Sequence, residues 1–148
     1  MKSQMDTTAD KNKYRLKVVS LLSKSSKKTK PNYFSSHLKP SIPIDPYISR
    51  VLHFIDCSAS IMTISLIYLK RIDPGLITES SIHRLFFCAI LVANKFLDDY
   101  HVGNEFFSQV GGIKKREIIK LELAFLKQIK FDLYVSDEEY NKELENIS

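Results

Sequence analysis

The chain has 148 residues, 44% of them hydrophobic, which is enough for one domain with a substantial core and too few for two. Its formal net charge of +5 is unevenly distributed. Residues 1–40 hold ten Lys and Arg against two acids, a net of +8, and residues 41–148 hold twelve against fifteen, a net of −3. A nucleic-acid-binding fold is expected to carry its positive charge on the folded body, so this distribution disfavours a nucleic-acid partner.

Two cysteines and the longest apolar run bear on where the protein works. Cys57 and Cys88 lie in apolar contexts and no secretory signal precedes them, so we expect reduced core residues of an intracellular protein in the nucleus or the cytoplasm. The longest apolar run, residues 85–93, is too short to span a bilayer, and we expect no membrane association.

Residues 1–40 are rich in Lys and Ser and are predicted to form a basic, disordered tail. One amphipathic stretch, residues 11–23, offers the alternative of a short arm that docks on another surface. Its apolar residues are Leu16, Val19, Leu21 and Leu22. A second cluster fits an import signal, although a solvated linker is the commoner role of such clusters; it contains Lys24, Lys27, Lys28 and Lys30.

The pattern after residue 40 is typical of helices joined by short loops, so the predicted fold class is all-α. Asp45 as a cap, followed by Pro46, predicts a first helix that ends near residue 56. Ser58 or Ser60 starts a second helix that ends near residue 72.

The third predicted helix covers residues 78–97 and is apolar on nearly every side. Thr78 is its predicted cap, and Ser81 occupies the position where a full capping box has Glu or Gln. A helix that is hydrophobic nearly all round belongs in the centre of a bundle, so we expect the other helices to surround this one.

The remaining sequence predicts two further bundle helices and a short final one. A short fourth helix follows Gly103 and is ended by Gly111 and Gly112, and a fifth covers residues 114–130. An extended segment, residues 131–135, separates the fifth helix from a short helix in residues 136–148, for which Ser136 is the predicted cap. We therefore expect a five-helix domain over residues 41–135.

Lys95 and Glu122 are the two charges set into apolar helical stripes. The residues one turn before Lys95 are apolar, as are those three and four positions on either side of Glu122. Burying an unpaired charge is prohibitive, so each must reach solvent, pair internally or face a second protein. Pairing with each other is expected in the free protein, and it is compatible with an interface role.

No constellation for catalysis is visible in the sequence. It lacks a glycine-rich phosphate loop, a nucleophile elbow, and His or Cys pairs at metal-ligand spacing, so we expect no enzyme activity, cofactor or metal. The adjacent Asp98 and Asp99 point about a third of a turn apart on a helix, which disfavours an acid/base dyad. They are interpreted as a solvated helix end, or as acceptors for a partner's Arg.

Three segments together resemble the cyclin box, and more closely the P-type cyclins, the PHO-family group also called U-type. They are YISRVLHFIDCSASIMTISLIYLKRI (residues 47–72), HRLFFCAILVANKFLDD (residues 83–99) and VGGIKKREIIKLELAFLKQIKFDL (residues 110–133). The resemblance implies a five-helix cyclin fold that binds and activates a cyclin-dependent kinase, PHO-pathway-like or related, as one monomer of a heterodimer.

In cyclins generally, a Lys at the end of the third helix and a Glu in the fifth reach the C-helix region of the kinase. The matching residues here are Lys95 and Glu122, the same two charges selected on physical grounds. The resemblance also assigns apolar interface positions, for which a core role is an equal alternative: Phe96, Leu126, Phe131 and Leu133. Asp99, at the rim, is a candidate acceptor for an Arg near the kinase activation loop.

The chain departs from the P-type pattern in several places. Ile119 stands where these cyclins usually have Asn, and Gly103 with Asn104 stands where they usually have a pair of Asn. The first-helix motif lacks the Trp of cell-cycle cyclins, so docking of the same substrate motif is not assumed. The alternative function is a helical adaptor that binds a partner without activating it.

Overall fold

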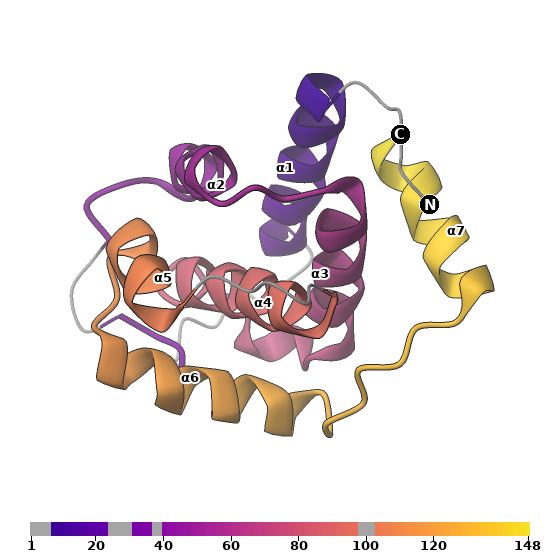
Figure 1. The fold of residues 1–148 in the computed structure, drawn as a ribbon. Coiled ribbons are helices and arrows are strands. Elements are labelled where there is room, and N and C mark those ends of the chain that lie inside the picture. The colour runs from indigo at the N-terminus through magenta and orange to yellow at the C-terminus, as the bar shows by residue number, and fades with distance from the viewer. Residues whose placement is uncertain (1–6, 24–30, 37–39, 98–102) are drawn as a thin grey trace.

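The computed structural model describes residues 7–23, 31–36, 40–97 and 103–148 and contains helices but no strand in these residues (Figure 1). The elements are α1 (Thr7–Ser23), α2 (Ile44–Phe54), α3 (Ala59–Arg71), the 3-10 helix η1 (Pro74–Leu76), α4 (Ile82–Leu97), α5 (Asn104–Gly111), α6 (Lys115–Gln128) and α7 (Asp137–Ile147). The all-α prediction is confirmed, and α2 to α6 correspond to the five expected helices of the domain.

Helix α4 lies at the centre of the molecule. It crosses the middle of the bundle, and α2, α3 and α6 all pack against it (Figure 1). From Ile82 to Asn94 every residue except Arg84 is buried, which is the burial that its nearly uniform apolar surface predicts. Both cysteines lie in this core as free thiols, and burial raises the pKa of Cys88.

Side-chain caps at two helix starts agree with the sequence. The Ser58 hydroxyl accepts a hydrogen bond from the Ile61 N–H at 3.2 Å, and the Ser136 hydroxyl accepts one from the Glu139 N–H at 3.1 Å. Gly112 ends α5 in the left-handed region, at φ 67°, which a glycine adopts without steric cost.

Two other helix starts differ from expectation. Helix α2 begins at Ile44 with Pro43 before it, so Asp45 lies inside the first turn, where its carboxylate pairs with Arg15 at 2.6 Å instead of capping the helix. Helix α4 begins at Ile82, four residues after the predicted start at Thr78. Thr78 and Ser81 instead form a turn before the helix, in which the Thr78 N–H donates to the Ser81 hydroxyl at 2.9 Å.

Of the two expectations for residues 1–40, the disordered tail is wrong for α1, and the alternative, a short arm that docks on another surface, is what the structure shows there. Tyr14, Val18 and Leu21 are buried, and the Tyr14 hydroxyl lies 2.7 Å from that of Ser65 on α3. Spacings of four and three residues place these side chains on one helix face, which packs against α2, α3 and α7. Leu16, one of the apolar residues of the predicted arm, is 61% exposed.

Residues 31–36 also belong to the folded body. Phe34 is buried, the Asn32 side-chain amide donates to the Leu76 carbonyl at 3.0 Å, and the Ser36 N–H donates to the Ser80 carbonyl at 2.9 Å. The four lysines considered as an import signal lie outside the described residues. Among the helices described, none is both long and apolar enough to cross a membrane.

Candidate protein-binding surface

Lys95 and Glu122 form an ion pair between α4 and α6. Lys95 lies in the last turn of α4, and its Nζ is 2.9 Å from Oε1 of Glu122 in the middle of α6. The two side chains are 27% and 20% exposed, so the pair is partly shielded yet reachable from solvent. The internal pairing expected from the sequence is therefore present, and it leaves both groups open to a partner.

Large apolar side chains on the same two helices as this pair, and just after α6, remain half exposed. Phe96, Leu97, Ile119, Leu123 and Phe131 are between 38% and 58% exposed. Soluble proteins rarely leave several large apolar side chains exposed together, and such a group marks an interaction site. We call the α4–α6 surface the set formed by these five apolar residues, the ion pair, and the partly buried Leu126 and Leu133. Its members are Lys95, Phe96, Leu97, Ile119, Glu122, Leu123, Leu126, Phe131 and Leu133.

The helical repeat of α6 explains why these residues share a face. Ile119 and Leu126 lie three residues before and four residues after Glu122, so all three project from the same side of the helix. Ile118 and Phe125 lie about 100° round the helix from Ile119 and Leu126, on the other flank of Glu122, and are fully buried against the core. One face of α6 therefore builds the domain while another is left open with apolar side chains.

The structure brings together most of the residues selected from the sequence. Lys95 and Phe96 close α4, Leu126 lies on α6, and Phe131 and Leu133 follow it, with both leucines packed partly against the core. The predicted rim residue, Asp99, lies outside the described residues.

Three residues of the α4–α6 surface are not predicted from the sequence to be exposed there: Leu97, Ile119 and Leu123. Apolar residues at helical spacing are usually core, so the sequence alone gave no reason to expose them. One signal was available at Ile119, which stands where P-type cyclins usually have Asn, a residue typical of an exposed position.

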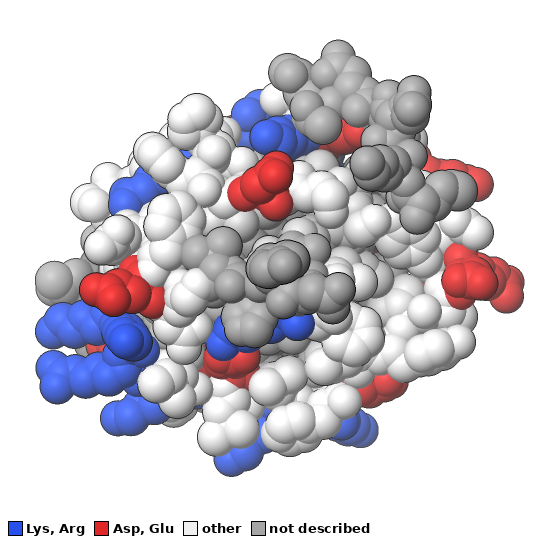
Figure 2. Space-filling model, in the orientation of Figure 1, with Lys and Arg blue, Asp and Glu red and all other residues white. Residues whose placement is uncertain are grey.

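Positive charge gathers at the start of α6, next to the α4–α6 surface. Figure 2 shows Lys and Arg side chains clustered over this end of the helix, where Lys114, Lys115 and Arg116 are exposed. The net charge of −3 summed over residues 41–148 does not reveal this local excess, because most of the acids lie elsewhere, including the start of α7.

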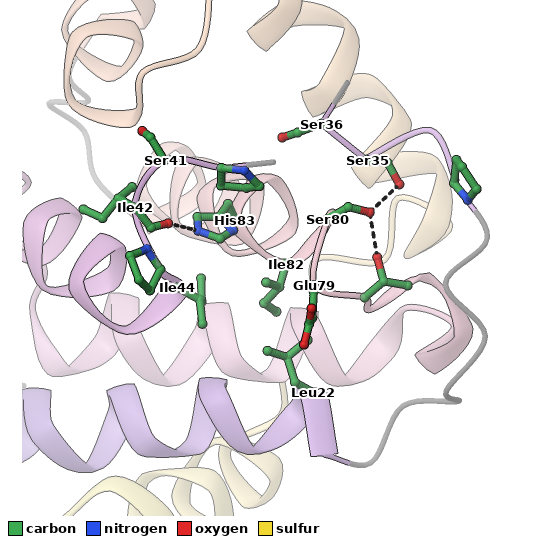
Figure 3. Close-up of a pocket in the computed structure, with 14 residues that line it drawn as sticks. Leu22, Ser35, Ser36, Ser41, Ile42, Ile44, Glu79, Ser80, Ile82 and His83 are labelled. Atoms are coloured by element: carbon green, nitrogen blue, oxygen red, sulfur yellow. Dashed lines mark hydrogen bonds between the residues drawn. The ribbon is translucent and has the colours of Figure 1, made fainter. Parts of the chain in front are cut away.

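An open pocket of about 840 Å³ lies near the opposite end of α4, between residues 31–36 and 40–44 on one side and the turn before the helix on the other (Figure 3). His83 lines it, and its Nε2 lies 2.7 Å from the Ile42 carbonyl. Burial lowers the pKa of His83, so the ring is neutral and Nε2 carries the proton that it donates. Within the described part of the chain no group of three His, Cys, Asp or Glu is placed to hold a metal ion.

Comparison with known proteins identifies the family of this chain. The cyclin family model matches residues 1–133. The chain is 40% identical to Cyclin-U4-3 of Arabidopsis thaliana over 120 residues, which cover 78% of this chain and 55% of that protein. It is also 40% identical to Cyclin-P4-1 of Oryza sativa subsp. japonica over 107 residues, which cover 70% of this chain and 50% of that protein.

The chain belongs to the cyclin family. Within that family its similarity is to the U-type and P-type cyclins, and family membership supports a regulatory rather than catalytic role. The chain spans about half the length of the curated relatives it matches.

Proposed function

We propose that this protein binds a cyclin-dependent kinase through the α4–α6 surface and favours its active conformation. The observation that carries the proposal is the Lys95–Glu122 pair, which is partly exposed and lies on the two helices that carry the half-exposed apolar side chains. A partner helix laid across this surface would bury the apolar side chains, and its backbone or polar groups would bond the two charges. A kinase of the PHO-pathway type is the first candidate, because the sequence resembles the P-type cyclins.

The mechanism we propose is a shift of the kinase between two states. In an inactive kinase the C-helix is displaced, so that its Glu cannot pair with the ATP-binding Lys. A cyclin that binds better to the kinase with the helix in place favours that state in proportion to the difference in affinity. Moving the population from about 1% to about 99% active requires about 5.5 kcal/mol of preferential binding.

Burial of the exposed apolar side chains of the α4–α6 surface can supply a preferential binding free energy of that size. Fully burying a large apolar side chain contributes about 1.5–3 kcal/mol, so burying the remaining half of one contributes roughly 1 kcal/mol. Five side chains of the surface are exposed to that degree. Their burial only against the active placement of the C-helix would supply about 5 kcal/mol, which matches the requirement.

Kinase activity measured with and without this protein tests the proposal. The variant is the double substitution Lys95→Ala with Glu122→Ala. The matched control is Arg84→Ala with Glu117→Ala, a pair at 3.4 Å that joins the same two helices about three turns away along α4 and about one and a half turns away along α6. Wild type and control should stimulate a cyclin-dependent kinase, and the first double variant, shown to be folded, should not.

Two other results would contradict the proposal in different ways. Binding of a kinase without stimulation would identify a helical adaptor. Equal stimulation by both double variants would show that the Lys95–Glu122 pair is only structural.

A further inference from the structure

Three consecutive backbone carbonyls after α6 accept hydrogen bonds from the last turns of α3. The Arg71 guanidinium donates to the carbonyls of Asp132 and Tyr134, at 2.8 Å each. The Tyr68 hydroxyl donates to the carbonyl between them, that of Leu133, at 2.9 Å. A segment without regular structure of its own is thus fixed by a helix more than 60 residues earlier in the sequence.

The backbone just before these carbonyls adopts a conformation that needs support. Lys130 and Phe131 have φ values of 57° and 55°, in the left-handed region. Each non-glycine residue there costs about 1 kcal/mol and persists when surrounding contacts hold it. The Phe131 N–H donates to the Leu126 carbonyl of α6 at 2.8 Å, which helps to hold the backbone, but the Phe131 ring is 57% exposed, so burial does little to hold the side chain in place.

Arg71 is suited to this task by its geometry. Its guanidinium reaches the two carbonyls and, through Nη2, the Glu139 carboxylate of α7 at 2.8 Å, and it lies 5.8 Å from the centre of the Tyr68 ring. A planar guanidinium bonds several acceptors in fixed directions, whereas a Lys ammonium acts as a point charge. Burial raises the pKa of Tyr68 to about 12, so its hydroxyl remains protonated and continues to donate.

We propose that Arg71 is a positioning residue for partner binding, which holds residues 131–135 so that Phe131 and Leu133 are already in place when the kinase docks. The inference rests on the proposed function. A segment ordered before binding loses less conformational freedom on binding, and each immobilised side chain spared in this way is worth up to roughly ten-fold in affinity. Glu139 keeps the guanidinium in the position from which it acts.

A single tryptophan placed at Phe131 tests the ordering directly, because the chain has no Trp of its own. In the Phe131→Trp protein, Arg71→Ala should lower the fluorescence anisotropy of that tryptophan. The matched control is Lys70→Ala, which removes the neighbouring ion pair at 2.8 Å to Glu143 of α7. The anisotropy should not change in the control. Unchanged anisotropy in the Arg71 variant would overturn the inference.

Affinity for the kinase that the wild type stimulates tests the consequence. Arg71→Ala should weaken binding about ten-fold when Phe131 is present and at most about two-fold in a Phe131→Ala background. Arg71→Lys, which keeps the positive charge, should recover only part of the loss. Equal losses in both backgrounds would indicate general destabilisation and contradict a positioning role.

Tyr68→Phe provides a second variant in case Arg71→Ala does not fold. It removes only the bond to the Leu133 carbonyl and should lower the anisotropy in the same direction by a smaller amount. If the wild type binds no kinase, the proposed function fails and the role in partner binding fails with it. The anisotropy would still decide whether Arg71 orders the segment, so the two failures are distinguishable.

Discussion

The Nζ of Lys95 lies 2.9 Å from Oε1 of Glu122, which joins the end of the central helix α4 to the middle of α6. Exchanging the two residues, Lys95→Glu with Glu122→Lys, keeps opposite charges at the same sites. We expect the unfolding free energy of this double variant to lie within about 1 kcal/mol of wild type, because partly exposed pairs contribute little. Kinase stimulation should nevertheless be lost, because a partner would meet each charge with the wrong sign. Denaturant unfolding and a kinase assay measure the two effects.

Lys95→Glu alone is the internal control for this exchange. It places two carboxylates at the pair, and should be less stable than the exchanged protein by about 1 kcal/mol. Stimulation that survives the exchange would mean that the pair only joins the two helices and that partner recognition lies elsewhere.

His83 makes stability depend on pH. The ring is buried against Tyr47, its Nε2 faces the Ile42 carbonyl, and among the described residues Nδ1 has no hydrogen-bond partner. Burial lowers the pKa of His83 below the ordinary value of 6.5. The unfolded chain therefore binds the proton first as the pH falls, and the stability that neutral His83 contributes above pH 6.5 is lost progressively below it.

Thermal unfolding from pH 8 to pH 5 checks this dependence. The wild-type Tm should fall by on the order of a few degrees more than that of His83→Gln over the same interval. The exposed His53 is a control, and His53→Gln should follow the wild-type curve. Parallel curves for wild type and His83→Gln would show that protonation of His83 is not coupled to unfolding.

The central bundle was predictable because local signals and burial agree there. Because apolar residues cover nearly the whole of α4, this helix can be buried only in the centre of the bundle. The hydroxyls of Ser58 and Ser136 cap the helices that follow them, as predicted. Helix α1 was predicted only as an alternative, the short arm over residues 11–23, because its buried stripe, Tyr14, Val18 and Leu21, is narrow and lies in a segment whose overall composition is that of a solvated tail.

The candidate surface was predictable in its charges and less so in its apolar part. Lys95 and Glu122 stand out because a charge in an apolar stripe demands a partner. Ile119 has the same character as its buried neighbour Ile118, and only the packed structure shows which of the two faces out. The position of Phe131 depends on a left-handed backbone and on Arg71, which lies 60 residues before it in the sequence.

Gly111 and Phe87 pack so closely that a side chain cannot be inserted between them. A Cβ added at Gly111 would lie 2.2 Å and 2.5 Å from two ring carbons of Phe87. That ring is fully buried and meets the Phe107 ring edge-on at a centroid distance of 5.9 Å, so it has no room to withdraw. Gly111→Ala should therefore destabilise the protein by about 2 kcal/mol, the cost of overpacking a core.

Gly103→Ala is a control without overpacking, since a Cβ at Gly103 meets no atom within 4 Å; Gly103 is the N-cap of α5, where alanine in place of glycine should cost at most about 1 kcal/mol. Replacing glycine by alanine inside a helix ordinarily stabilises it by about 0.5–1 kcal/mol, so the contact with Phe87 is expected to reverse the sign at Gly111, the last residue of α5. Chemical denaturation of both variants measures the two effects. A Gly111→Ala protein as stable as wild type would mean that the Phe87 ring moves aside, and that the packing of α5 on the central helix is looser than these distances imply.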